Sequence, residues 1–203
     1  ATFLKNSGVG DWMTGMAMGA CGGAAGGPAK AAVIASALEG TVSGSSVANT
    51  VGSGSITIPL MKKTGYKPEF AGAVEAAAST GGQIMPPIMG AAAFIMTEYV
   101  GVPYNTIAFA AVIPAILYFT GIYANVHFEA MRKGLLGVPK EQRPSVSHLL
   151  KTGWYKIAPL LIIIFLLGSG RSVMYSALFG ILSCMVIWVI NIFASGEKFN
   201  LKE

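Results

Sequence analysis

Long apolar stretches alternate with short polar segments along most of this chain. The stretches at 104–128 and 157–194 consist mainly of apolar and small residues, and a short turn near Gly170 divides the second stretch in two. A helix needs about 20 apolar residues to cross a bilayer, so these stretches predict transmembrane helices. Another apolar stretch, at 69–100, is longer than one span requires. The pattern predicts an all-α polytopic membrane protein.

Two polar tracts interrupt this pattern, one at 40–49 and one at 79–87. Unpaired backbone groups are costly in hydrocarbon, so irregular backbone at membrane depth occurs only where protein buries it or where it lines a cavity. The stretch 29–56 has two halves too short to cross alone, which predicts a re-entrant helical hairpin with its tip at 43–46. The stretch 69–100 predicts a transmembrane helix broken into two half-helices.

Composition narrows the functional classes. Only 11% of the 203 residues are charged and 53% are hydrophobic, which fits a membrane protein. The formal net charge is +5, but lysine and arginine lie in loops, and no nucleic-acid motif accompanies them, so we expect no binding to nucleic acid. Cys21 and Cys184 are far apart and predict neither a disulfide framework nor a metal cluster. Residues 1–28 read as an incomplete N-terminal helical segment of a longer protein.

The distribution of basic residues predicts the orientation. The segment 131–156 holds six lysine and arginine residues, whereas the turn near Gly101 holds none and the turn near Gly170 holds only Arg171. Loops on the cytoplasmic side carry an excess of lysine and arginine. The sequence therefore predicts a basic cytoplasmic loop at 131–156 of a protein in the bacterial inner membrane, in contact with the lipid bilayer.

The two polar tracts supply the candidate binding residues. Unwound backbone exposes carbonyl oxygens, and together with hydroxyl and amide oxygens these can replace the water shell of a sodium ion. We predict that the two tracts meet and form one ion and substrate site, which includes Ser43, Gly44, Ser45, Ser46, Asn49, Thr80, Gly81, Gly82, Gln83 and Pro86. Within this predicted site, we expect Na⁺ to be bound by Ser43, Ser45, Asn49, Thr80 and Gln83. Half-helix N-termini beside the same gap favour a substrate carboxylate.

Glu75 is a further candidate for this site. An ionisable residue inside a membrane segment is a functional hypothesis by default. The alternative is that Glu75 reaches the membrane surface, because it lies only about two turns from Glu69. No permanently bound cofactor is expected. The coupling ion is Na⁺, with H⁺ as the alternative.

Four motifs resemble the large membrane (permease) subunit of the tripartite ATP-independent periplasmic (TRAP) transporters. They are Gly-Pro-Ala-Lys at 27–30, Thr-Val-Ser-Gly-Ser-Ser-Val-Ala-Asn at 41–49, Ile-Pro-Leu-Met-Lys-Lys-Thr-Gly-Tyr at 58–66, and the run 70–94, which contains Ser-Thr-Gly-Gly-Gln-Ile-Met-Pro-Pro. The most similar branch has fused membrane subunits and works with a TAXI-type solute receptor. Dicarboxylate-type relatives tend to have aspartate where this chain has Asn49, so the local negative charge is absent here.

The resemblance implies an elevator-type secondary transporter with two inverted repeats, each made of a re-entrant hairpin and a broken helix. This chain corresponds to the first repeat, the N-terminal half of the transport unit, and 157–194 begins the second repeat. The implied partners are the missing second half of the permease, a small membrane subunit or fused domain, and a periplasmic TAXI-type receptor. The implied function is import of a small carboxylate-containing solute by ion symport.

Two other functions are alternatives to a transporter. An intramembrane serine hydrolase would use Ser43 or Ser45 as nucleophile and His127 as base, but the chain has no G-x-S-x-G motif and His127 follows a span at the membrane edge. A channel or structural membrane subunit is the other alternative, and a channel would need a continuous pore rather than a site closed between helix breaks.

Overall fold

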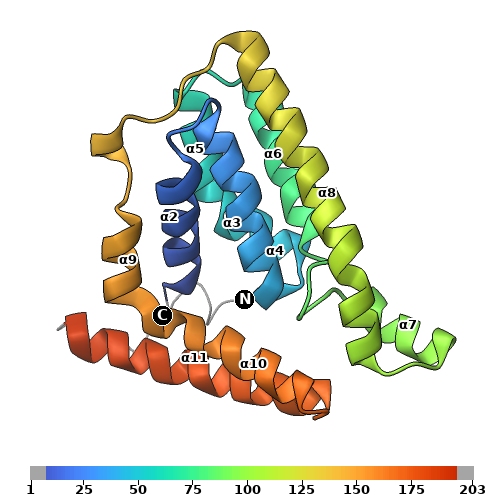
Figure 1. Cartoon of the computed structure of the whole chain (residues 1–203). Coiled ribbons are helices and arrows are strands. Elements are labelled where there is room, and N and C mark those ends of the chain that lie inside the picture. Colours follow the sequence, from blue (N-terminus) through green and yellow to red (C-terminus); the bar gives the residue numbers. More distant parts are fainter. Residues whose placement is uncertain (1–7, 196–203) are drawn as a thin grey trace.

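The computed structural model describes residues 8–195, and within that range it contains helices and no strands (Figure 1). The all-α prediction is therefore confirmed for this part of the chain. The α-helices are α2 (Val9–Cys21), α3 (Gly27–Ser43), α4 (Ser46–Gly52), α5 (Gly54–Lys63), α6 (Pro68–Gly81), α7 (Ala92–Val100), α8 (Tyr104–Lys133), α9 (Val146–Gly153), α10 (Ala158–Gly168) and α11 (Val173–Ser195). Two short 3₁₀ helices, η1 (Lys140–Gln142) and η2 (Trp154–Ile157), flank α9.

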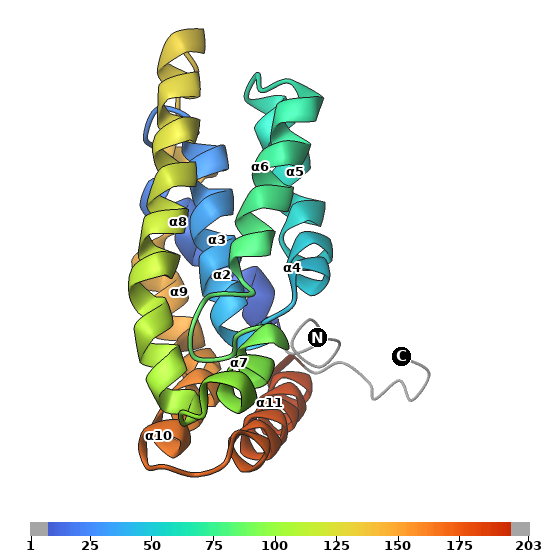
Figure 2. The same ribbon diagram turned by 90° about the vertical axis from the view of Figure 1, so that its right-hand side faces the viewer.

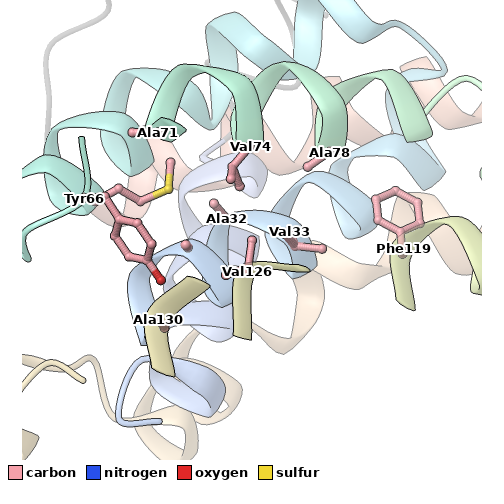
Figure 3. Packing of buried hydrophobic residues seen from close by; sticks show 11 residues of the cluster. Ala32, Val33, Tyr66, Ala71, Val74, Ala78, Phe119, Val126 and Ala130 are labelled. Atoms are coloured by element: carbon pink, nitrogen blue, oxygen red, sulfur yellow. The ribbon is translucent and has the colours of Figure 1, made fainter. Parts of the chain in front are cut away.

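Helix α3 lies at the centre of the fold and packs against α2, α6 and α8. Its small residues are buried on all sides, as expected for a helix surrounded by other helices. Figure 3 shows Ala32 and Val33 of α3 between Val74 of α6 and Val126 of α8. Small side chains let helix backbones approach closely, which is how helices pack in membranes. The core is therefore built around α3.

The first interrupted stretch forms a helical hairpin. Helix α3 is the first arm, the chain turns at Gly44, and α4 and α5 return along α3 as the second arm. The predicted range 29–56 is too short at both ends. The first arm begins at Gly27 because Pro28 suits the first turn of a helix. The second arm continues through Pro59 to Lys63.

The second interrupted stretch is also broken, between α6 and α7. The non-helical segment spans 82–91, so it begins later than the predicted start at Ser79. Ser79 and Thr80 remain helical, and their hydroxyls bond groups one turn back, Glu75 Oε1 at 3.2 Å and the Ala76 carbonyl at 2.7 Å. A run of serine, threonine and glycine therefore need not unwind at its first residue.

Helix α8 runs continuously through Pro114 and ends at Lys133 rather than at the predicted residue 128. Glu129 extends it by pairing with Arg132 and Lys133 at 2.8 Å each, one turn further along the same helix. His127 consequently lies inside the helix and does not follow it. Figure 2 shows α8 along one side of the molecule, where much of its apolar surface is exposed. An exposed apolar face of this length fits contact with lipid.

The predicted loop 131–156 is partly helical. It contains η1 and α9, and α9 lies against α2, where the indole nitrogen Nε1 of Trp12 donates a hydrogen bond of 2.8 Å to the Leu149 carbonyl. Val146 also approaches Gly19, where an added Cβ would lie 2.7 Å from its side chain. The basic segment is therefore fastened to the N-terminal helix.

The Trp12 contact leads to a stability prediction. Replacing Trp12 by phenylalanine keeps an aromatic ring but removes the N–H donor, and we expect a loss of about 1 kcal/mol in the free energy of unfolding. Denaturant unfolding of the detergent-solubilised permease measures it. Trp154→Phe is the control, because that side chain is 69% exposed and its replacement costs less than about 0.5 kcal/mol. Equal losses in both variants would show that the hydrogen bond from Trp12 to Leu149 does not contribute to stability.

The segment 157–194 forms an antiparallel pair, α10 and α11, that crosses the end of the other helices (Figure 1). The amide of Asn105 in α8 donates to the Leu167 carbonyl at 2.6 Å and so attaches α10. Among the described residues, two helical stretches are long and apolar enough to cross a membrane, Tyr104–Lys133 and Lys140–Gly168, and Met174–Ile187 is a shorter apolar helix.

Candidate functional site

The turn of the hairpin is made by two adjacent residues. Gly44 adopts a left-handed conformation with φ of 59°, and its N–H donates to the Gly40 carbonyl at 3.2 Å, which ends α3. Glycine adopts this conformation without the steric cost of a side chain. Ser45 is extended and caps α4, because its Oγ accepts a hydrogen bond from the Ala48 N–H at 3.3 Å. One helix thus ends and the next begins within two residues.

Asn49 joins the two arms just behind this turn. Its side chain is 1% exposed. The Oδ1 atom accepts a hydrogen bond from the Ser43 hydroxyl at 2.5 Å, and the Nδ2 atom donates to the Ser36 carbonyl at 3.1 Å. The Ser43 oxygen also accepts from the Ser45 N–H at 3.4 Å. The side-chain oxygens of Ser43 and Asn49 therefore face each other at the end of α3.

The two breaks are in contact. The side-chain amide of Gln83, in the α6–α7 break, donates to the Ser46 hydroxyl at 2.7 Å. Gly82 packs on the hairpin so closely that an added Cβ would lie 2.5 Å from Asn49 Nδ2. The same holds for Gly40, whose added Cβ would lie 2.5 Å from the Gly82 Cα. Glycine at both positions lets the first hairpin arm touch the second break.

Three of the predicted site residues do not join this contact. Thr80 is exposed and its hydroxyl bonds the Ala76 carbonyl of its own helix. Gly81 faces α8, where an added Cβ would lie 2.7 Å from both Tyr118 and Phe119. Pro86 lines an apolar cavity of about 280 Å³ between the break, α8 and α10. Thr80 and Gly81 lie outside the contact because α6 continues to Gly81, and successive residues of a helix point in different directions around its axis.

Side-chain oxygens and helix-end carbonyls come together at the contact between the breaks. The last carbonyls of a helix lack partners within it and carry partial negative charge, and those of α3 end here beside Ser43 and Asn49. Neutral oxygens of this kind suit a monovalent ion better than Ca²⁺, which prefers carboxylate ligands. Residues 8–195 contain no group of three or more histidine, cysteine or acidic side chains able to hold a metal ion.

Glu75 does not reach the membrane surface. The structure buries it completely, with 0% exposure, so the alternative that it extends along the helix to the lipid headgroups is wrong. Four hydroxyl groups surround its carboxyl group, those of Ser36, Ser53, Thr57 and Ser79. The sequence analysis missed these four residues. One signal was available, since Ser53 and Thr57 are four residues apart, as are Glu75 and Ser79, which places each pair on one helix face.

His127 is not placed to activate a serine. Its Nδ1 atom lies 3.0 Å from the Nζ atom of Lys30, near the start of α3. Ser43 ends the same helix thirteen positions later, which corresponds to about 20 Å at 1.5 Å per residue. Nucleophilic catalysis needs hydroxyl and imidazole within hydrogen-bond reach. The geometry therefore argues against the serine hydrolase.

Comparison with known proteins agrees with a transporter. A family model described as "Tripartite ATP-independent periplasmic transporter, DctM component" matches residues 1–203. The chain is 30% identical over 172 residues to the C4-dicarboxylate TRAP transporter large permease protein DctM of Vibrio cholerae, which covers 83% of the chain and 36% of that protein. It is 28% identical over 143 residues to the sialic acid TRAP transporter large permease protein SiaM of Vibrio cholerae, covering 68% and 32%.

A third relative is the protein y4mL of Sinorhizobium fredii, which is 31% identical over 136 residues, or 66% of the chain and 32% of that protein. The chain thus spans about a third of the length of each of these relatives.

Proposed function

Because the chain belongs to the DctM component family of the tripartite ATP-independent periplasmic transporters, we propose that it is part of a permease importing a small carboxylate-containing solute by symport with Na⁺. The two Vibrio cholerae relatives are named for a C4-dicarboxylate and for sialic acid, which supports an acidic solute. The family is one of transporter components, which disfavours the enzyme alternative.

The contact between the two helix breaks carries this proposal. A sodium ion would bind at the end of α3, among the oxygens of Ser43 and Asn49 and the last carbonyls of that helix. Ser45 and Gln83 lie on the open side of the same contact and supply further oxygens. Each side-chain oxygen now engaged in a hydrogen bond has a second lone pair for the ion.

The membrane arrangement is proposed on the same basis. The hairpin α3 to α5 re-enters the bilayer and α6 and α7 form the broken helix, so that both breaks lie at membrane depth, as in transporters with inverted repeats. The chain is then the N-terminal half of an elevator-type transport unit in the inner membrane, with 131–156 cytoplasmic and 157–194 beginning the second repeat. Its partners are the second half, a small membrane subunit or fused domain, and a periplasmic receptor of the TAXI type.

Uptake into proteoliposomes tests the proposed function. The complete permease, with its small subunit or fused domain and its receptor, is reconstituted and supplied with a panel of labelled dicarboxylates and acidic amino acids. We expect saturable uptake of one of them that requires the receptor and stops when an ionophore dissipates the sodium gradient. One charge moving through 100 mV supplies about 2.3 kcal/mol, enough for roughly fiftyfold accumulation. Uptake that persists without any ion gradient would contradict symport.

A further inference from the structure

The carboxyl group of Glu75 is buried in the helical core with no cation beside it. Within residues 8–195 the ion pairs between side chains are those of Glu129 with Arg132 and Lys133. The buried lysine of α3, Lys30, contacts His127 and the ring of Tyr123 instead. A buried carboxylate without a cation costs several kcal/mol, so the group neutralises by taking up a proton or binds an ion.

The four hydroxyls around Glu75 come from different parts of the hairpin and from α6. Its Oε1 atom lies 2.6 Å from the oxygen of Ser53, 3.2 Å from that of Ser79 and 3.4 Å from that of Ser36. Its Oε2 atom lies 2.5 Å from the oxygen of Thr57. The contacts of 2.6 Å and 2.5 Å are short enough for strong hydrogen bonds to the carboxyl group. We call these four residues the hydroxyl cage.

The hydroxyl cage satisfies both the charged and the neutral form of Glu75. A hydroxyl has one hydrogen to donate. The hydroxyls of Ser53 and Thr57 each have a backbone carbonyl within reach as a second acceptor besides Glu75. The Ser53 oxygen also lies 2.9 Å from the Asn49 carbonyl, and the Thr57 oxygen lies 3.0 Å from the Ser53 carbonyl.

When Glu75 is ionised, both hydroxyls donate to it. When Glu75 is protonated, a hydroxyl can turn to its own helix carbonyl and accept the hydrogen of the carboxyl group. A proton can thus be bound or released without moving a heavy atom.

We propose that Glu75 is a proton-binding site that is separate from the cation site at the helix breaks. A carboxyl proton would lie in one of the two short contacts, at 2.6 Å to Ser53 or at 2.5 Å to Thr57, where the hydroxyl oxygen can accept it. A sodium ion at the same position is the alternative that the sodium titration distinguishes. The inference does not depend on sodium binding at the breaks.

The proton site is connected to the breaks through Asn49. The amide of Asn49 donates to the Ser36 carbonyl, while the Ser36 hydroxyl approaches Glu75. The Ser53 hydroxyl likewise contacts both the Asn49 carbonyl and Glu75. An ion at the breaks that displaced Asn49 would also displace two members of the hydroxyl cage. Asn49 is thus the residue through which a cation at the breaks would affect Glu75.

Glu39 is the other charged group directed at this region. It is a buried residue of α3 that accepts a hydrogen bond from Thr14 at 3.2 Å. Both carboxyl groups flank the joint between α4 and α5, since an added Cβ on Gly52 would lie 3.0 Å from Glu39 Oε2 and one on Gly54 would lie 3.0 Å from Glu75 Cγ. Two nearby carboxylates resist simultaneous ionisation, so a proton on Glu75 has to be distinguished from a proton on Glu39.

The remaining titratable groups on the elements packed against α6 are engaged elsewhere or exposed. Tyr118 of α8 donates to the Ala77 carbonyl at 2.9 Å, and Tyr123 and His127 of the same helix are at the Lys30 contact. Lys62 and Lys63 of α5 are exposed, as is Glu69 at the start of α6, and α4 has no titratable side chain. Glu39 is therefore the main neighbour whose charge a pH titration must take into account.

Infrared difference spectroscopy of the complete permease tests the proton site directly. We expect a protonated-carboxyl C=O band in the wild type that disappears as the pH is raised and is missing in Glu75→Gln. The band remains in Glu69→Gln, which alters an exposed glutamate on the same helix. Glu39→Gln, measured in parallel, separates the contribution of the second buried carboxyl. A wild type without a titrating band, or a band retained in Glu75→Gln, would overturn the proposal.

A second variant covers the case in which Glu75→Gln fails to fold. Ser79→Ala removes a single hydroxyl of the cage, at 3.2 Å. Hydroxyl donors favour the charged form, so the band of Ser79→Ala will persist to more alkaline pH than that of the wild type. An unchanged pH response would contradict the role of the hydroxyl cage.

Adding sodium at constant pH distinguishes a proton at Glu75 from a sodium ion at Glu75. If sodium binds at Glu75 itself, adding it will abolish the carboxyl band also in Asn49→Leu, whose site at the breaks is removed, and this result would overturn the proton assignment. If the proposal holds, sodium affects the band only when Asn49 is intact. A band that titrates with pH although transport shows no sodium dependence would refute sodium symport and leave the proton site standing.

Discussion

Replacing Asn49 by leucine will raise the sodium concentration required for half-maximal uptake by about five- to 150-fold. Leucine has a similar size but removes the ligand oxygen, and it leaves the Ser43 hydroxyl and the Ser36 carbonyl without their partner. Removing one polar partner of a buried charge costs about 1 to 3 kcal/mol, and every 1.4 kcal/mol is a factor of ten in affinity. Initial uptake rates of the complete permease in proteoliposomes, measured against sodium concentration, give the shift.

The control for Asn49→Leu is Thr50→Val, at the next position of the same short helix. The Thr50 hydroxyl bonds the Ser46 carbonyl of its own helix at 2.9 Å and does not contact the α6–α7 break. We expect its sodium dependence to stay within about twofold of the wild type. An equal shift in both variants would indicate general damage to α4, and no shift in Asn49→Leu would remove Asn49 from the site.

Replacing Gly40 by alanine will destabilise the permease by about 1 to 3 kcal/mol, although alanine is the better helix former. The added methyl group would lie 2.5 Å from the Cα atom of Gly82 and would push the hairpin away from the second break. Both contacting groups are backbone, Gly40 within α3 and Gly82 directly after the end of α6, so the clash is not relieved by a side-chain rotation. The free energy of unfolding in denaturant measures the effect.

Gly72→Ala is the matched control, because Gly72 also lies inside a helix but an added Cβ there would meet no atom within 4 Å. This variant will be stabilised by about 0.5 to 1 kcal/mol through helix propensity alone. The two substitutions are chemically identical and are expected to act in opposite directions. Stabilisation by both would mean that Gly40 and Gly82 are not in contact.

The helices could be predicted from sequence because apolar length and the positions of glycine and proline limit where a helix can run. Their exact ends could not. Ser79 and Thr80 look like part of a break by composition, yet each hydroxyl bonds a group one turn back and the helix continues. Likewise, Pro59 did not end α5, since a proline removes one hydrogen bond while packing against α3 and α6 retains the helix.

The site was predictable only in outline. Glycine and serine tracts indicated which segments are unwound, and the same logic suggested that the tracts meet. Which side chains face the contact depends on helical phase, and for this reason the Thr80 hydroxyl bonds its own helix instead of the contact. Three of the four hydroxyls of the cage reach Glu75 from 18 to 39 positions away, and Ser36 also contacts Ser53, 17 positions away. Nothing in the local pattern of small polar residues specifies such pairings.

Calorimetric sodium titration of the complete purified permease tests most directly whether the two helix breaks form one cation site. The account predicts saturable sodium binding by the wild type and by Thr80→Val, whose hydroxyl bonds its own helix, and loss of binding in Asn49→Leu. The Thr80 variant distinguishes a site confined to the contact seen between the breaks from the larger site predicted from the sequence. A wild type that binds no sodium, or binding that survives in Asn49→Leu and disappears in Thr80→Val, would contradict the account.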